Sequence, residues 1–168
     1  MNRAPKIYLA GKISKNDWRH DLVPRLRGRK HGDGPIDCAN FVYVGPFFRS
    51  CDHGCAHRPG THGVAGAACD GVEITQRDVF NRNQSALASA NVVVAYIEAA
   101  DCHGTIFEIG FAARMGKRIH LIFAPGVEFD DFWYAAQAAS LLPESTVVPR
   151  ADLPETFARA IADWLDWR

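Results

Sequence analysis

Residues 92–123 read VVVAYIEAADCHGTIFEIGFAARMGKRIHLIF, and this stretch decides the fold. Residues 92–97 are apolar or aromatic without interruption, which predicts a buried strand. Residues 104–116 predict a helix that Gly116 ends, and 118–123 predict the next buried strand. Short apolar strands that alternate with helices are typical of a parallel sheet with both faces covered.

The same alternation continues on both sides of this stretch. The further expected elements are strands over 6–10, 41–45 and 146–149, a helix capped by Asn16 or Asp17 that carries Trp18, Leu22 and Leu26, and helices over 73–90, over 129–142 up to Pro143, and over 153–167. We therefore expect residues 1–168 to form one α/β domain. Its sheet should be doubly wound, flavodoxin- or Rossmann-like and parallel, with about five strands and helices on both faces.

Composition limits the classes of function. The chain has 168 residues, of which 48% are hydrophobic, so a globular core is expected. The formal net charge of +0 disfavours a nucleic-acid polymer or a membrane as partner, and no apolar run is long enough to span a bilayer. The opening MNRAPKIYLAGKI predicts a strand rather than a signal peptide. The five cysteines then indicate reduced thiols or metal ligands in a cytoplasmic protein.

The position of any active site follows from the fold class. Ligands of open parallel sheets bind beyond the carboxyl ends of the strands. The segments expected at those ends are 11–16, 45–70, 97–105 and 124–130. The residues with binding or catalytic chemistry should therefore come from these segments.

Glu108 is a carboxylate within a helix that is otherwise almost entirely apolar or small. One interpretation is a capping box, T-x-x-E, in which Thr105 is the N-cap and Glu108 satisfies a backbone N–H. The other interpretation is chemical. A carboxylate on the first turn of a helix that follows a central strand is kept ionised by the helix dipole, and it can act as a nucleophile or stabilise a cation.

The sequence around Glu108 resembles the nucleoside 2-deoxyribosyltransferase family, which includes the nucleoside 5′-monophosphate N-glycosidases. The residues that match the family's motif are Gly104, Glu108, Gly110, Ala112, Gly116 and Lys117. The opening strand and glycine turn, KIYLAGKI, also match, as does the Arg77-Asp78 pair. Cys102 departs from the pattern, because many members have an aspartate at that position.

This resemblance implies an enzyme that cleaves an N-glycosidic bond without a cofactor or metal. Glu108 would attack the anomeric carbon, and water or a second base would then take the sugar. The departing base needs a proton or a hydrogen bond, for which the resemblance indicates Asp78. The alternative for Asp78 is an exposed helix face. Asp101 or His103 could fill the place that Cys102 leaves, although His103 could equally be an exposed loop residue.

Glycines and small residues near Glu108 have expected structural roles. Gly104, together with Thr105, would let a substrate approach the backbone at the start of the helix. Gly110 and Ala112 would keep the helix close to the sheet.

Backbone N–H groups at the start of a helix attract anions, which indicates an anion site at Gly11, Lys12 and Arg19. A 5′-phosphate could bind there, although ordinary surface charge is the commoner role of any one lysine or arginine.

The segment 45–70 is rich in glycine, cysteine and histidine, and we expect it to set substrate choice. Phe47 could stack on a base, as could Phe48, and His53 could contact base or phosphate, although core packing of the rings is as probable. A zinc site built from Cys51, Cys55, His57 and His62 is an alternative, and reactive thiol chemistry is a third.

Two other classes of function stay open at this level. One is a non-enzymatic nucleotide-binding or sensing module, and the other is a zinc-dependent hydrolase that uses the Cys51–His62 loop. The substrate expected in the main hypothesis is a small nucleoside or nucleotide. The aromatic segment 129–142 further predicts a homodimer or a higher homo-oligomer. Base and sugar specificity, and transfer as against hydrolysis, do not follow from the sequence.

Overall fold

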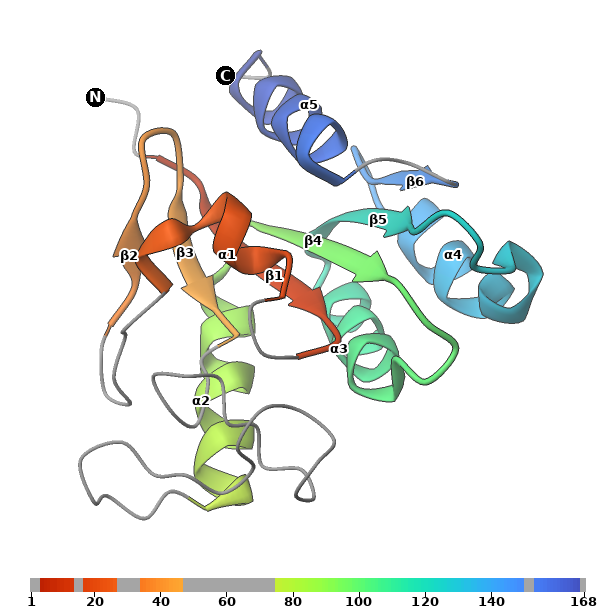
Figure 1. Cartoon of the computed structure of the whole chain (residues 1–168), viewed down its shortest axis with the longest axis horizontal. Coiled ribbons are helices and arrows are strands. Elements are labelled where there is room, and N and C mark those ends of the chain that lie inside the picture. The colour runs from red at the N-terminus through yellow and green to blue at the C-terminus, as the bar shows by residue number, and fades with distance from the viewer. Residues whose placement is uncertain (1–3, 14–16, 27–33, 47–74, 150–152, 167–168) are drawn as a thin grey trace.

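The computed structural model describes residues 4–13, 17–26, 34–46, 75–149 and 153–166. These residues form a six-stranded sheet in the order β2-β3-β1-β4-β5-β6, shown in Figure 1. The strands are β1 (Lys6–Gly11), β2 (Ile36–Asp37), β3 (Val42–Gly45), β4 (Val92–Ile97), β5 (Arg118–Phe123) and β6 (Thr146–Val148). Every neighbouring pair is parallel except β2 and β3, which are antiparallel. The predicted α/β fold is confirmed.

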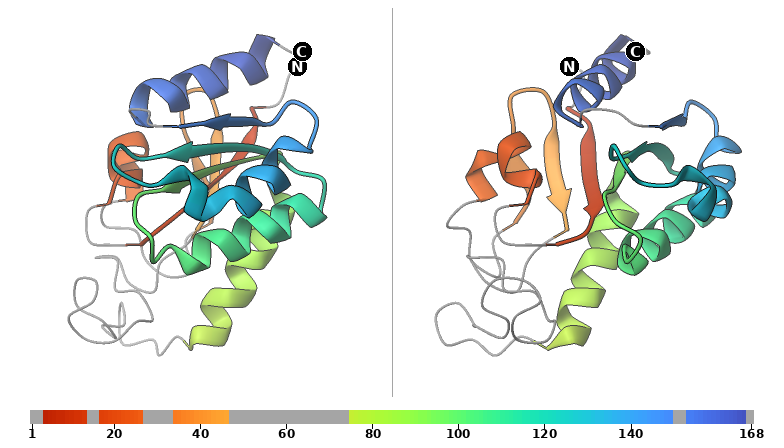
Figure 2. Two further views of the ribbon diagram at one scale, coloured as in Figure 1. Left: turned by 90° about the vertical axis from the view of Figure 1, so that its right-hand side faces the viewer. Right: turned by 45° about the vertical axis from the view of Figure 1, so that its right-hand side comes forward.

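Helices cover both faces of this sheet, as the two views of Figure 2 show. The helices are α1 (Arg19–Leu22), the 3₁₀ turn η1 (Pro24–Leu26), α2 (Gln76–Ser89), α3 (His103–Arg114), the 3₁₀ turn η3 (Phe129–Phe132), α4 (Trp133–Ser140) and α5 (Leu153–Asp166). Helices α2, α3 and α4 pack on one face, and α1, η1 and α5 lie on the other. Among the described residues, no helix is both long and apolar enough to cross a membrane.

Two hydrophobic clusters, one on each face of the sheet, form the core. Side chains alternate between them along β1, because Tyr8 and Ala10 belong to the α3 side while Ile7 and Leu9 belong to the α1 side. All four are 0% exposed. A strand buried on both faces reads as a continuous apolar run, which explains why the sequence predicted it well.

The order of the strands creates one switch point in the sheet. From β1 the chain goes to β3 on one side, and it then crosses to β4 on the other side of β1. The carboxyl ends of β1 and β4 therefore diverge into helices on opposite faces, and a crevice is expected between them. Lys12 follows β1, and the segment from Glu98 to the start of α3 follows β4.

Several boundaries differ from the sequence-based expectations. The helix expected to reach Leu26 ends at Leu22, because Pro24 has no N–H to continue it and begins a 3₁₀ turn. The expected helix over 129–142 divides into η3 and α4. Strand β2 was not expected, because two residues are too few to show a periodic pattern. Gly116 ends α3 as predicted, with a φ of 65°.

Candidate active site

Glu108 lies on α3 against the central strand β1. The Tyr8 hydroxyl donates a hydrogen bond of 2.5 Å to Glu108 Oε1, across 100 positions of sequence. Tyr8 is 0% exposed, and Glu108 is partly buried beside it. The helix is held there by Ile109 and Ala112, which are 0% exposed in the cluster between α3 and the sheet.

The environment of Glu108 disfavours its charged form. Burial raises the pKa of the carboxyl to about 7, while the hydrogen bond from Tyr8 and the positive charge of Arg19 act in the opposite direction. The pKa of the Tyr8 phenol is raised well above its ordinary value, first by burial and then by the neighbouring Glu108 carboxylate. Tyr8 therefore stays a neutral donor, and Glu108 changes between acid and carboxylate near neutral pH.

Gly45, at the end of β3, makes room for the Tyr8 ring. A Cβ atom built at Gly45 would lie 2.8 Å from Tyr8 Cε2 and 3.1 Å from the Ala86 Cβ. Contacts that short do not occur without a shift of the neighbouring atoms, and both neighbours are buried. The glycine is thus a packing requirement of the Tyr8–Glu108 pair.

The capping interpretation of Glu108 is wrong. Helix α3 begins at His103 with Cys102 as its N-cap, so Thr105 lies inside the first turn and Glu108 lies in the second. The Glu108 carboxylate binds Tyr8 instead of a backbone N–H at the cap. Thr105 is 2% exposed, and its Oγ1 has no hydrogen-bond partner.

A capping box does occur in the protein, at Asp78. Thr75 is the N-cap of α2, and its Oγ1 accepts a hydrogen bond of 3.1 Å from the Asp78 N–H. Asp78 Oδ2 in turn accepts from the Thr75 N–H at 3.0 Å and from the Thr75 hydroxyl at 2.6 Å. The exposed Asp78 carboxylate thus has a structural role at the helix start, and its role toward a base stays a prediction.

Arg19 is buried instead of being available to a phosphate. Its guanidinium is 0% exposed and donates to the Leu9 carbonyl at 2.7 Å and to the Gly11 carbonyl at 2.6 Å. It also donates to the Lys12 carbonyl at 3.2 Å and to Asp17 Oδ2 at 2.8 Å. Three of these hydrogen bonds, to the carbonyls of Leu9, Gly11 and Lys12, fix the end of β1. The expected phosphate ligand is therefore a structural residue.

Lys12 and Asp101 form an ion pair across the carboxyl ends of β1 and β4. Lys12 Nζ lies 2.8 Å from both Asp101 carboxylate oxygens. The hydrogen bond with Lys12 holds the pKa of Asp101 below its ordinary value, and the same bond raises the pKa of Lys12. Two expected site residues are thus brought together, in a pair that spans the switch point of the sheet.

The start of α3 leaves open space at its outer side. His103 and Gly104 are exposed, and a Cβ atom at Gly104 would meet nothing within 4 Å. A Cβ at Gly110 would likewise meet nothing, so the expectation that Gly110 keeps the helix close to the sheet is wrong. Ala112, which is 0% exposed, does fill that role.

Several expected site residues lie outside the described part of the chain. They are Phe47, Phe48, Cys51, His53, Cys55, His57 and His62. Within the residues that the structure describes, no group of three or more His, Cys, Asp or Glu side chains is arranged to hold a metal ion.

Two residues at the site were missed from the sequence. Tyr8 lies in the predicted strand over 6–10, but the alternation of side chains along a strand does not show that its hydroxyl binds Glu108 on α3. Glu98 directly follows β4, is partly buried, and has a pKa raised chiefly by burial. The sequence could have indicated Glu98 as a site residue, because it directly follows a predicted central strand and such positions border ligand crevices.

Comparison with known proteins supports the fold without naming a function. No family model and no curated protein matches the chain. A crystal structure of a conserved protein from Enterococcus faecalis V583 is similar, with a TM-score of 0.58 and 15% identity over 96% of this chain and 99% of that one. A structure of Era in complex with MgGDPNP and a segment of 16S ribosomal RNA aligns with a TM-score of 0.47 and 12% identity, over 96% of this chain and 57% of that chain. The first likeness shows a shared fold alone, and the second is too distant to carry an argument.

Proposed function

We propose that this protein cleaves the N-glycosidic bond of a nucleoside or nucleoside 5′-monophosphate, with Glu108 as the nucleophile. The observation that carries the proposal is the Tyr8–Glu108 pair, a partly buried carboxyl fixed by a hydrogen bond of 2.5 Å at the central strands. A carboxyl that is costly to bury and is not part of the helix cap calls for another role. The motif resemblance around Glu108 points to the same chemistry.

The proposed reaction proceeds in two displacements. A Glu108 carboxylate oxygen forms a bond to the anomeric carbon as the bond from that carbon to the base nitrogen breaks, through an oxocarbenium-like transition state. The base leaves with the bonding electron pair and takes up a proton. Water or a second base then attacks the same carbon, breaks the ester bond and restores the Glu108 carboxylate.

Three candidates for the proton donor follow β4, and a fourth, Asp78, lies at the start of α2. Asp101 is a poor acid, because Lys12 stabilises its charged form and lowers its pKa. Glu98 is a better one, since burial raises its pKa and so keeps a proton available nearer neutral pH. His103, exposed at the start of α3, and Asp78 complete the set.

The Glu108 pKa of about 7 gives the proposed reaction a characteristic pH dependence. Only the ionised carboxylate can attack a sugar carbon, so kcat/KM should rise as the pH passes through about 7. Tyr8 donates to one oxygen of the carboxylate, which orients the group and leaves the other oxygen for the sugar.

We further propose a homo-oligomer. Among the residues that the structure describes, seven large hydrophobic side chains are exposed, namely Phe80, Phe107, Met115, Phe129, Trp133, Tyr134 and Leu141. Four of them belong to the segment 129–142 that first indicated association. A mass measurement by light scattering at micromolar concentration tests this, and a monomer there would contradict it.

The decisive experiment measures base release by chromatography. Wild type, Glu108→Gln and a control, Glu155→Gln, are compared on a panel of nucleosides and monophosphates, with and without an acceptor base. Glu155 is an exposed carboxylate on α5 that pairs with Arg159 at 3.1 Å. We expect Glu108→Gln to lose activity by roughly a thousandfold or more, and the control to retain it. Full turnover in Glu108→Gln, or no release from any substrate by wild type, contradicts the proposal.

A slow fluorinated substrate tests the covalent step separately. A glycosyl adduct on the peptide that contains Glu108, found by mass spectrometry, is the expected result. Its absence, with base release intact, would indicate direct attack by water.

A further inference from the structure

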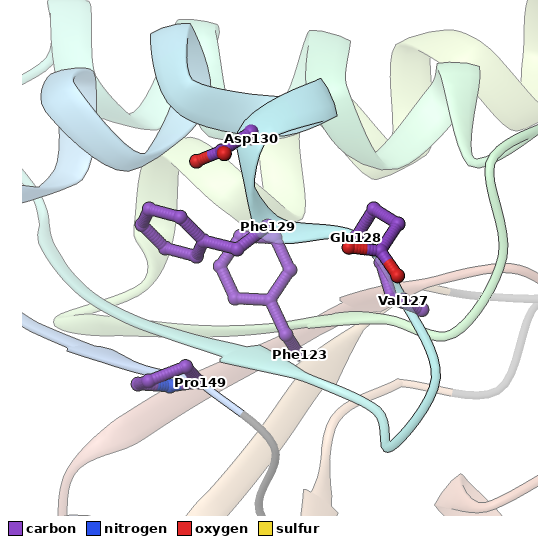
Figure 3. A pocket seen from close by; sticks show the side chains of 6 residues that line it. All are labelled: Phe123, Val127, Glu128, Phe129, Asp130 and Pro149. Carbon is purple, nitrogen blue, oxygen red and sulfur yellow. The ribbon is translucent and has the colours of Figure 1, made fainter.

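A pocket lies at the carboxyl end of β5, on a different strand from the Tyr8–Glu108 pair. It has a volume of about 180 Å³ and is lined by Phe123, Val127, Glu128, Phe129, Asp130 and Pro149. Figure 3 shows these side chains gathered around one space between the end of β5, the segment that follows it, and the residue after β6. None of the lining residues belongs to the site described above.

Aromatic rings form part of the wall of this pocket. The rings of Phe123 and Phe129 pack edge to face, with centroids 5.0 Å apart. Phe123 is 0% exposed, and the Phe132 ring packs against it at 6.0 Å, so its position is fixed from behind. Phe129 is 37% exposed, and Figure 3 shows its ring beside that of Phe123. Fixed ring faces carry negative quadrupole charge and attract cations.

The charged lining residues have the same sign. Glu128 and Asp130 are both exposed beside the rings, and no basic residue is among the side chains that line the pocket. Within the described part of the chain, neither carboxylate takes part in an ion pair or a side-chain hydrogen bond. Two unpaired carboxylates repel an anion and attract a cation, whereas they give a neutral ligand no electrostatic stabilisation. The charges of the lining therefore favour a cationic ligand.

The size and the ligand atoms of the pocket distinguish between kinds of cation. Two oxygen-bearing side chains line it, fewer than the set of oxygens with which a protein encloses Ca²⁺. A cavity of about 150 Å³ admits a molecule as large as benzene, so about 180 Å³ admits a compact organic group. The aromatic surface rewards a weakly hydrated cation with methyl or methylene groups over a small metal ion.

We propose that this pocket binds a small alkylammonium compound, whose charged head rests against the exposed Phe129 ring, which Phe123 supports, and between the Glu128 and Asp130 carboxylates. The binding does not depend on Glu108 or on the function proposed for it. The pocket would therefore bind its ligand equally well in a Glu108→Gln protein.

The test uses tetramethylammonium chloride as the probe, at constant ionic strength balanced with sodium chloride. Amide shifts of the full chain are followed by NMR, with tert-butanol as an uncharged probe of similar shape. We expect saturable shifts confined to residues 123–130 and their neighbours, and affinity for tert-butanol at least roughly tenfold weaker. Equal affinity for the two probes, shifts that do not saturate, or shifts centred on Glu108 would each overturn the proposal.

Variants separate the contribution of the Phe129 ring to binding from that of the two carboxylates. Phe129→Leu should weaken tetramethylammonium binding roughly three- to tenfold, because it removes the exposed ring face. Glu128→Gln/Asp130→Asn keeps the rings and should weaken the cation without affecting tert-butanol. The control is Asp131→Asn, an exposed carboxylate next in the chain that does not line the pocket. If it weakens binding as much as the double variant does, the attraction is a diffuse surface charge and the pocket is not the site.

Discussion

Replacing Glu108 by Gln should stabilise the protein at alkaline pH while it removes the proposed activity. The folded-state pKa of about 7 lies above the ordinary value of 4.5, so the fold binds the proton more tightly than the unfolded chain does. Wild-type stability therefore falls as the pH rises from about 4.5 through about 7, and it is level above that. Glutamine does not titrate, and its side-chain oxygen can still accept from Tyr8.

The size of this effect follows from the two pKa values. At about 1.4 kcal/mol for each pKa unit, the difference between 4.5 and about 7 corresponds to roughly 3 kcal/mol. The free energy of unfolding of Glu108→Gln, relative to wild type, should increase by that amount between pH 4.5 and 8.5. A smaller positive change would still fit, because the carboxyl is only partly buried.

Denaturant unfolding at several pH values measures the difference, with Glu155→Gln as the control. The control should follow the wild-type curve, because Glu155 is exposed on α5. Parallel stability curves for wild type and Glu108→Gln would refute the reasoning, since they would show that burial does not perturb the carboxyl. A variant whose stability relative to wild type falls as the pH rises would instead show that the ionised group stabilises the fold.

Four other changes give distinct outcomes. Tyr8→Phe removes the hydrogen bond that lowers the pKa of Glu108, so the rise of kcat/KM with pH should move upward from about 7 while kcat falls. Gly45→Ala forces a Cβ against the Tyr8 ring and should cost about 1–3 kcal/mol in denaturant unfolding. Gly110→Ala meets open space in mid-helix and should instead gain about 0.5–1 kcal/mol; equal effects at the two glycines would contradict this account. Lys12→Met should leave the melting temperature nearly unchanged, because the ion pair is solvent-exposed.

The fold was largely accessible from the sequence because its signals are local. Strand β4 is a continuous apolar run, β5 is apolar apart from Arg118 and His120, and Gly116 marks the end of α3 by its backbone conformation. The start of α3 was misplaced because Thr105-x-x-Glu108 has the residue types of a cap. A threonine followed three residues later by an acidic residue does form a cap at Thr75 and Asp78. The residue types alone do not distinguish Thr105 and Glu108 from Thr75 and Asp78. Tertiary packing decides which of the two pairs lies exposed at a helix start.

The candidate site was accessible only in part. Glu108 was found because a carboxylate in an apolar helix is conspicuous, yet its partner Tyr8 lies on a strand 100 positions away. Arg19 was expected at the surface, where most arginines lie, and instead it is enclosed by the carbonyl groups at the end of β1. Both errors concern long-range or burial-dependent contacts, which single-sequence patterns do not carry.

The position of β1 between β3 and β4 also has a consequence for how the protein would acquire the proposed activity. Tyr8 is on the strand that joins the early and the late halves of the chain, because β1 pairs with β3 on one side and with β4 on the other. Parallel pairing between such distant segments forms late in folding, after long loops have closed. A folding intermediate that has α3 but lacks the β1–β4 ladder would have Glu108 without Tyr8. Recovery of catalysis after dilution from denaturant would then report completion of the central sheet, and it should lag behind the recovery of helix content.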